Sequence, residues 1–389
     1  MPLRLGIVGL GAVAQLVYEP ILARRRDLFE IVGVAELSRA VRDAVGGRLG
    51  VDRAGRHASV EELLAGGGLD AVLVLSSGSH GAVVDAVTAE GIPVLVEKPL
   101  AWTHAELDRL ASRSGLIQVG YMKRFDPAYR RVAELLDGGG SAIRAVEVTV
   151  LHPSDARQTA FRGGTLATAT DVAPERAAAG HAHSELLRAR ALGGAAAILG
   201  WVYSDVLLGS LIHDLAVLRP LVGDPRDIGW ARLWPEDWHP ERLSVGFDAD
   251  LAGAAQLSLR WHYLPDYPSY TETVRVHTET ASYVLTFPAP YLLHAPTRLS
   301  VTSAREGYTE VTESTSHLEA FEAQLADFHR GVANGLAPAI GLAEARADLR
   351  TCQRLAAALA ATLGLRIGGE AAGTADAAEP VGATGSPRQ

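Results

Sequence analysis

The sequence is poor in cysteine and in positive charge, and each shortage excludes a class of protein. Its one cysteine, Cys352, excludes an internal disulfide framework and a thiolate zinc site, so we expect a reducing, cytoplasmic compartment. Lys and Arg total 36 against 45 Asp and Glu, which gives a net charge of −9. This balance does not provide the basic surface that nucleic acid and anionic membranes require, so we expect neither as a partner.

Long apolar runs are also missing. The N-terminal sequence MPLRLGIVGLG is broken by glycines before it reaches the length of a signal-peptide core, and no stretch of 18 apolar residues follows. The 13 histidines show no HExxH or comparable ligand spacing, which predicts no metal site. What is present is a chain of 389 residues, 48% hydrophobic and 21% charged, the composition of a globular protein with room for two domains.

The first 124 residues alternate short apolar runs with stretches of helical periodicity. The apolar runs are residues 3–8, 30–35, 71–75, 93–96 and 117–119. The helical stretches are residues 13–26, 39–49, 60–65, 81–90 and 103–112. This alternation predicts repeated βαβ units, and therefore an α/β fold with a doubly wound parallel sheet over residues 1–124, its strands buried on both faces.

The pattern changes after residue 124 and predicts an α+β domain over residues 125–366. Expected helices cover 127–136, 204–221 (with Ser204 as N-cap), 317–335 and 342–363. Alternating polar and apolar residues at 142–151, 242–250, 253–262, 271–277, 281–287 and 298–303 predict an open, mostly antiparallel sheet. Residues 154–200 carry no clear pattern, and 367–389 have the composition of a disordered tail.

A glycine-rich turn joins the first apolar run to the first helical stretch. Gly9 permits a tight turn, Gly11 lets the backbone approach a pyrophosphate, and Ala14 keeps the third position small enough for helix and strand to pack. Together with Ala12 and Val13, these residues would hold the phosphates of NAD or NADP at a helix N-terminus. The alternative is an incidental glycine-rich turn in another kind of α/β domain.

Glu36 follows the second apolar run and lies 22 residues after Ala14, close to the spacing of about 20 found in dinucleotide-binding domains. A carboxylate here accepts hydrogen bonds from ribose hydroxyls and repels a 2′-phosphate, which favours NAD over NADP. Arg39 and Arg42 could soften that preference. The alternative is a solvated charge at a strand end.

Glu97, Lys98 and Pro99 end the fourth apolar run, at the edge of the sheet where open α/β folds bind their ligands. A lysine amine at this place can give a proton to a nascent alkoxide or take one from a hydroxyl, and burial would lower its pKa towards neutrality. Taken alone, the three residues are more often an exposed charge pair before a turn.

Several longer segments make the chain similar to the Gfo/Idh/MocA oxidoreductases, the family of glucose-fructose oxidoreductase and inositol dehydrogenase. The segments are GIVGLGAVA, SSGSHGAVVDAVTAEGIPVLVEKPLAWTHAEL, VGYMKRFDPAY, GSLIHDLAVLRPLVG, TETVRVHTETASYVLTF and HLEAFEAQLADFHRGVANG. They span residues 3 to about 362 in the family's order. The resemblance implies a Rossmann domain followed by an α+β domain, a nicotinamide cofactor, a sugar or cyclitol substrate, and a homo-oligomer (dimer or tetramer) formed through the C-terminal sheet.

The resemblance also implies roles for particular residues. Lys98 matches the family's conserved lysine, and His213 matches the histidine of its catalytic helix; these are the candidate catalytic residues. The resemblance and the glycine turn together indicate the candidate cofactor-binding residues, which are Gly9, Gly11, Ala12, Val13, Ala14, Glu36, Arg39, Ser76, His80, Glu97 and Lys98. The candidate substrate-binding residues are Tyr121, Arg124, His152, Gly209 and His213. For His80 a helix-start cap is the competing interpretation, and for His152 a solvated strand end.

One position departs from the family's pattern. Many members carry a carboxylate one helical turn before the histidine, and here that position is Gly209. Asp214 lies about 100° around the helix from His213, and Asp205 lies two turns away from it, so neither is an obvious substitute. The competing interpretation of His213 is a structural histidine.

These observations predict an NAD(P)-dependent dehydrogenase or reductase that acts on a secondary alcohol or ketone of a sugar, cyclitol or related cyclic metabolite, with Lys98 as acid or base. Two alternatives stay open. One is a lyase or glycosidase-like enzyme that uses NAD in an internal redox cycle. The other is a cofactor-binding regulator without turnover, which the missing carboxylate at Gly209 would favour.

Overall fold

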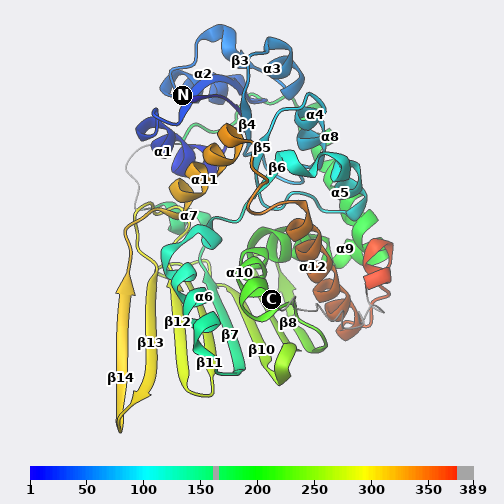
Figure 1. Ribbon diagram of the computed structural model, residues 1–389. Coiled ribbons are helices and arrows are strands. Elements are labelled where there is room, and N and C mark those ends of the chain that lie inside the picture. The colour runs from blue at the N-terminus through cyan, green and yellow to red at the C-terminus, as the bar shows by residue number, and fades with distance from the viewer. Residues whose placement is uncertain (161–165, 375–389) are drawn as a thin grey trace.

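A parallel six-stranded sheet forms the centre of the N-terminal domain in the computed structural model, which describes residues 1–160 and 166–374 (Figure 1). Its strands are β1 (Leu3–Val8), β2 (Phe29–Ala35), β3 (Arg56–His57), β4 (Ala71–Val74), β5 (Val94–Glu97) and β6 (Ile117–Gly120). Their order is β3-β2-β1-β4-β5-β6, and every pair is parallel. The residues of β4, β5 and β6 are all buried, as strands covered on both faces must be. The predicted doubly wound sheet is confirmed.

Helices connect these strands at the places that the periodicity predicts. They are α1 (Glu19–Arg24), α2 (Arg39–Arg48), α3 (Val60–Gly66), α4 (Gly81–Ala89) and α5 (His104–Leu110), with the 3₁₀ turns η2 (Arg53–Gly55) and η3 (Ala111–Leu116). The first connection differs from the single helix expected over 13–26. After the glycine turn the chain forms a π-helix, η1 (Ala14–Tyr18), and only then α1. Such wide turns are frequent at functional sites.

An eight-stranded sheet forms the C-terminal domain, and its order is β14-β13-β12-β11-β7-β10-β9-β8. The strands are β7 (Ile143–His152), β8 (Ile228–His239), β9 (Arg242–Asp250), β10 (Gln256–Tyr263), β11 (Thr271–Thr278), β12 (Ala281–Phe287), β13 (Arg298–Arg305) and β14 (Tyr308–Thr315). β7 and β10 pair in parallel, and the other neighbouring pairs are antiparallel. The predicted open, mostly antiparallel sheet is confirmed, although β8 and β14 were not expected individually.

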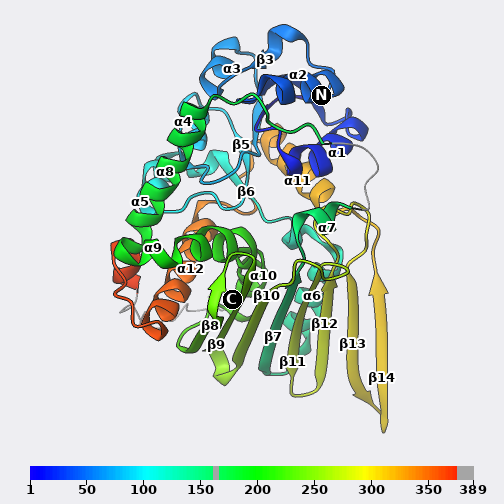
Figure 2. The same cartoon turned by 180° about the vertical axis from the view of Figure 1, so that it is seen from behind.

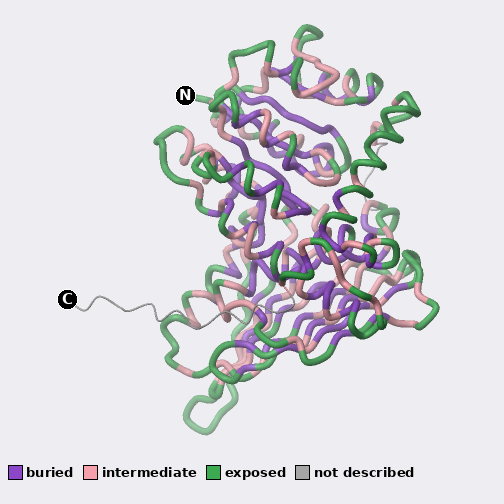
Figure 3. Tube along the Cα trace, turned by 90° about the vertical axis from the view of Figure 1, so that its right-hand side faces the viewer, coloured by how far each residue is buried: buried purple, intermediate pink, exposed green. Residues whose placement is uncertain are grey.

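The helices α6 (Pro127–Gly139) and α10 (Ile212–Val222) lie on one face of this sheet, and Figure 2 looks onto the opposite face. Burial therefore alternates along β11, where Glu272, Val274 and Val276 are buried while Arg275 is exposed. Figure 3 shows that the buried residues follow the two sheets, whereas the edge strand β14 is exposed along its whole length.

The unassigned region between β7 and β8 is mainly helical. It contains α7 (Asp155–Thr159), α8 (Pro174–Leu192), η5 (Gly193–Ala195), α9 (Ala196–Trp201) and the π-helix η6 (Val202–Leu211), which runs into α10. The stretch Pro174–Val222 has the length and apolar composition of a membrane-crossing helix, but 61% of its most apolar window is buried inside the protein, as in a core helix. Figure 2 shows the extended segment before α8 passing along the N-terminal domain near α2.

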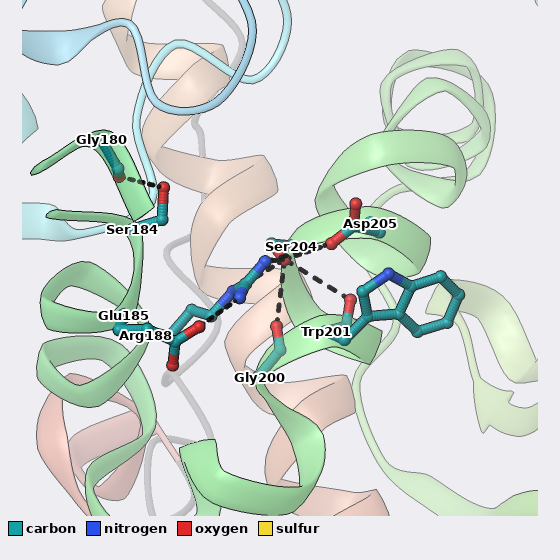
Figure 4. Close-up of polar contacts among 8 residues, drawn as sticks. All are labelled: Gly180, Ser184, Glu185, Arg188, Gly200, Trp201, Ser204 and Asp205. Carbon is teal, nitrogen blue, oxygen red and sulfur yellow. Dashed lines mark hydrogen bonds and ion pairs between the residues drawn. The ribbon is translucent and has the colours of Figure 1, made fainter. Parts of the chain in front are cut away.

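The expectation that Ser204 begins a helix is wrong, because the helical stretch starts eight residues earlier, at Ala196. Ser204 lies inside η6 and is buried (Figure 4). Its hydroxyl donates to the carbonyl of Gly200 at 3.1 Å and accepts from the guanidinium of Arg188 at 2.8 and 3.0 Å. This residue therefore anchors α8 to the helix that follows, which a cap would not do.

The last helices return to the N-terminal domain. The side chains of Phe321 and Leu325 on α11 (Ala320–Asn334) pack in the same core as Ile7 and Val17. α12 (Leu342–Thr362) lies against α5 and β6. The C-terminal domain predicted over 125–366 therefore shares its final helices with the Rossmann domain.

The disorder expected from residue 367 is not found over residues 369–374. Residues Gly369–Thr374 form a 3₁₀ helix, η8, and Ala371 is fully buried. The Glu370 carboxylate accepts hydrogen bonds from the main-chain amides of His104 and Ala105 at 2.6 and 3.0 Å, which caps the start of α5. Residues 375–389 lie outside the described residues.

Candidate active site

The glycine turn has the backbone that a dinucleotide site needs. Gly9 has φ +89°, and a Cβ atom there would lie 2.5 Å from the amide nitrogen of Ser76. Only glycine fits this approach between the ends of β1 and β4. Among the residues that the structure describes, no atom lies within 4 Å of the position that a Cβ would take on Gly11, so the backbone is open on that side. Ala14 is buried against the sheet, so the predicted turn fits a pyrophosphate.

The Glu36 carboxylate lies directly beside this turn. One oxygen accepts from the Leu10 amide at 2.9 Å, and the other accepts from the Ser38 amide at 3.0 Å. Arg42 donates to the main-chain carbonyl of Glu36 at 2.6 Å, and Arg39 extends into solvent, 3.6 Å from an Asp43 oxygen. Both arginines therefore interact with groups other than the Glu36 carboxylate.

His80 connects two loops at the edge of the sheet. Its ring nitrogens lie 2.6 Å from the Ser76 carbonyl and 2.7 Å from the Pro99 carbonyl, and the residue is buried. Burial lowers the pKa of His80, against the raising effect of the two carbonyls. It caps no helix with its side chain. The contacts fit a residue that holds the loop after β4 against the segment carrying Lys98.

Lys98 follows β5 and is held from both sides. Its Nζ atom donates to the main-chain carbonyl of Gly209 at 2.5 Å, and its amide donates to the Glu97 carboxylate at 3.3 Å. The other Glu97 oxygen accepts from the hydroxyl of Tyr18 at 2.7 Å. Burial lowers the pKa of Lys98; the charge of Glu97 opposes this, and the charge of Lys123 adds to it. The amine therefore gives up its proton more readily than an ordinary lysine.

A cavity of about 170 Å³ lies between the two domains around this amine. It brings together many of the residues that the sequence predicts, which are Val13, Glu97, Lys98, His152, Gly209 and His213. The cavity thus joins the helix after the glycine turn, the lysine and the histidine-bearing helix in one space.

Two predicted substrate-binding residues do not line the cavity. Tyr121 is almost fully buried, and burial raises its pKa together with the nearby charge of Asp348. Arg124 is half-buried outside the cavity. The chain enters the 3₁₀ turn η4 (Met122–Phe125) at this point, and this turn brings Met122 and Lys123 to the cavity instead.

His213 lines the cavity, and its buried Nδ1 atom has no hydrogen-bond partner within residues 1–160 and 166–374. Burial lowers the pKa of His213 well below its usual value, and the charges of Lys98 and Lys123 lower it further. The ring is therefore neutral near pH 7 and keeps one unprotonated nitrogen. His152 also lines the cavity and packs beside Tyr270, with its pKa lowered by burial.

A buried charged cluster on the cavity wall is absent from the sequence-based candidates. Lys123 pairs with both oxygens of Glu272, and the Tyr270 hydroxyl also donates to Glu272. Burial would raise the pKa of Glu272, but its bonds to Lys123 lower the pKa overall. Asp214 lies beside Glu272, and its pKa is raised well above the usual value by burial and by that neighbouring charge. Glu272 is thus the ionised member of the pair.

Two signals in the sequence could have identified this cluster. The chain contains two lysines and 34 arginines, and both lysines line the same cavity. Glu272 also occupies an inward position of β11, in phase with Val274 and Val276, where an acid has to be paired. Among residues 1–160 and 166–374, no group of three or more His, Cys, Asp or Glu side chains is arranged to hold a metal ion.

The comparisons with known proteins agree with this geometry. Residues 3–116 match an oxidoreductase family described by its NAD-binding Rossmann fold. Over 145 residues the chain is 34% identical to inositol 2-dehydrogenase 1 of Saccharopolyspora erythraea, which covers 36% of this chain and 42% of that protein. The match thus spans about two fifths of the length of this relative.

Solved structures with the same fold match nearly the whole chain. Scyllo-inositol dehydrogenase of Lactobacillus casei, solved with NAD(H) and scyllo-inositol, matches with a TM-score of 0.64 and 18% identity, over 93% of this chain and 98% of that one. The aldose-aldose oxidoreductase of Caulobacter crescentus, complexed with glycerol, matches with a TM-score of 0.68 and 18% identity, over 95% and 100%. At this identity the likeness establishes the two-domain fold.

Proposed function

Because the N-terminal domain of this chain belongs to the Gfo/Idh/MocA family of NAD-binding Rossmann-fold oxidoreductases, we propose that the protein is an NAD(P)-dependent dehydrogenase or reductase. Its substrate is a secondary alcohol or ketone on a sugar, cyclitol or related cyclic metabolite. The observation that carries this proposal is the half-buried Lys98, whose amine lies in a cavity that also contains His213 and the start of the cofactor helix.

The nucleotide, held by the glycine turn and Glu36, supplies the hydride acceptor or donor. The chain's own residues handle the proton. In alcohol oxidation the neutral Lys98 amine takes the hydroxyl proton, and in ketone reduction the ammonium returns it. The Gly209 carbonyl accepts one N–H of Lys98 and so fixes the direction in which the rest of the amine points.

The polar wall of the cavity provides the substrate contacts. The His213 ring lines the cavity, and its unprotonated nitrogen can accept a hydrogen bond from a substrate hydroxyl, because the ring is neutral. The helix that carries His213 has Gly209 where the family's pattern places an acid. Glu272 supplies a carboxylate on the wall of the same cavity. A polyhydroxylated ring offers several donors and acceptors to such a wall, which favours a sugar or cyclitol over an apolar ketone.

A panel of cyclitols, sugars and their keto forms, assayed by NADH absorbance with NAD and NADP, tests this proposal. We expect turnover on at least one polyhydroxylated ring. Tight nucleotide binding without turnover on any member would favour the regulator, and a cofactor that co-purifies and catalyses without net NADH formation would favour the internal redox cycle.

The outer face of the C-terminal sheet and its edge strand support a homo-oligomer. All eight residues of β14 are exposed, including Tyr308 and Val311. An exposed edge of this length is normally covered, because its unpaired backbone groups attract another strand or sheet. We therefore place a subunit contact there and the enzyme in the cytoplasm, as its single cysteine favours.

A further inference from the structure

The segment before α8 contributes a carboxylate to the nucleotide-binding region, although it lies far from that region in the sequence. Asp171 lies in the extended stretch before α8, 133 residues from Ser38, and reaches the N-terminus of α2. One carboxylate oxygen accepts from the Ser38 hydroxyl at 2.5 Å, and the other accepts from the Ala40 amide at 3.0 Å. The bond from Ser38 and then the one from Ala40 lower the pKa of Asp171, so the side chain is ionised.

The segment is anchored to the helix of the glycine turn. Gln15 donates from Nε2 to the Ala167 carbonyl and accepts from the Ala167 amide at Oε1, both at 2.9 Å. Gln15 is buried in η1, and its Nε2 atom also donates to the Leu10 carbonyl at 2.9 Å. Leu166 packs against the apolar cluster that includes Leu10. Asp171 is therefore positioned by the same elements that form the nucleotide site.

Asp171 binds at the place where this type of fold distinguishes NAD from NADP. The acid at the end of β2, here Glu36, meets the ribose 2′-hydroxyl of NAD, whereas NADP-binding domains accommodate the 2′-phosphate nearby with a cation. Ser38 lies two residues beyond Glu36 and is also hydrogen bonded to it. Donors at a helix N-terminus suit a phosphate. At this helix a carboxylate of the chain, Asp171, already occupies the donors of Ser38 and Ala40.

We propose that Asp171 is a second cofactor-specificity residue, which acts with Glu36 to exclude the 2′-phosphate of NADP. The proposal rests on the proposed function, because it concerns the same nucleotide site. Asp171 disfavours the phosphate twice: its negative charge repels the dianion, and its hydrogen bonds remove the donors that the phosphate would need. NAD carries a neutral hydroxyl at this position and is affected by neither.

Fluorescence titration of the full chain with NADH and NADPH, without substrate, tests the proposal. The Asp171→Asn variant keeps the shape of the side chain and removes its charge. We expect the ratio of the two dissociation constants (NADPH over NADH) to fall about tenfold in this variant, the effect of removing one charge a few ångströms from a dianion. The difference from wild type should shrink at 1 M salt, because the carboxylate is exposed.

Glu175→Gln provides the matched control. Glu175 is an exposed acid in the first turn of α8, so the substitution changes the net charge equally at a position outside the Ser38 contact. An unchanged ratio in Asp171→Asn, or an equal change in Glu175→Gln, would overturn the role of Asp171. If the wild-type chain binds neither dinucleotide, the proposed function itself fails, and with it the inference. The two failures are therefore distinguishable.

Discussion

The Nζ atom of Lys98 donates a hydrogen bond to the main-chain carbonyl of Gly209 across the domain interface. The carbonyl belongs to the π-helix η6, which leads into the helix of His213. A carbonyl orients the amine as a carboxylate would, but it carries no charge and does not stabilise the ammonium form to the same extent. The site therefore combines a well-held lysine with a lowered pKa, which is what a proton-transfer group near neutral pH needs.

Substitution of Lys98 by Ala should remove the proton-transfer group and leave the nucleotide site intact. General acid–base catalysis contributes about 10²- to 10⁴-fold, so we expect kcat to fall by at least the lower figure. The dissociation constant of NADH, measured by fluorescence, should change little. Lys98→Arg is the matched variant, because it keeps a cation that cannot release its proton at neutral pH. Wild-type turnover in either variant would contradict the assigned role.

The pKa of Lys98 can be measured directly, because the chain has only two lysines. Reductive ¹³C-methylation labels both amines and the N-terminus, and the Lys98→Arg variant assigns the signals in the NMR spectrum. We expect the Lys98 signal to titrate below the ordinary value for lysine, because burial disfavours the ammonium form. The neutral amine is the base, so kcat/KM for oxidation should rise with pH up to this pKa. For reduction it should fall as the pH rises through the same value.

Introducing a carboxylate at Gly209 should move that pH profile. Of the described part of the chain, a Cβ atom there would meet only the Ser204 carbonyl, at 3.3 Å, so the helix has room for a side chain after a small adjustment. In Gly209→Asp we expect the pKa of Lys98 to rise by about 1 unit or more, since an opposite charge favours the ammonium form. The pH at which kcat/KM for oxidation stops rising then shifts upward by the same amount. Gly209→Ala supplies the side chain without the charge, and an equal shift in both variants would exclude this explanation.

The sequence predicts the elements whose signals are local. The Rossmann strands are apolar runs between helices, and Gly9 and Ala14 are placed by a motif in which each residue has a steric reason. Lys98 and His213 are found because each lies in a recognisable segment. Lys98 and His213 line the same cavity. The resemblance to the family predicts this, because it implies how the two domains are arranged.

What the sequence does not predict depends on contacts between distant segments. Tyr121 and Arg124 are chosen over Lys123 because nothing local shows that η4 brings Lys123 to the cavity. The helix that contains Ser204 starts earlier than expected. The Ser204 side chain binds Arg188 of α8 instead of capping a turn, and this contact between distant residues has no local signal. Asp171 lies in a region without any pattern, and its role depends on a hydrogen bond to a residue 133 positions away.

The edge strand β14 gives a prediction for the oligomeric state. We expect the wild-type chain to form a dimer or tetramer by light scattering coupled to size exclusion. Val311→Asp places a charge on this exposed strand and should shift the mass towards the monomer. Leu336→Asp makes the same change at an exposed residue after α11 and should leave the mass unchanged. A monomeric wild type, or an equal effect of both variants, would place the subunit contact elsewhere or remove it.

The Lys123–Glu272 pair allows a stability role to be separated from a role in substrate binding. Glu272→Gln leaves the buried Lys123 ammonium without its counter-ion, and breaking a buried pair on one side costs about 3–5 kcal/mol. We therefore expect a lower melting temperature, and also a KM for the cyclic substrate that rises by roughly tenfold or more, because a hydrogen bond to a charged group is lost.

The double variant Lys123→Met/Glu272→Leu removes both charges and fills similar volumes. Replacing a buried ion pair with apolar side chains is often neutral or stabilising, so the melting temperature should recover relative to Glu272→Gln. If Glu272 contacts the substrate, KM must stay high in the double variant, because the carboxylate is still missing. A KM that recovers together with the melting temperature would mean that Glu272 acts only through the fold, and His213 and Lys98 would then be left as the polar contacts for the substrate.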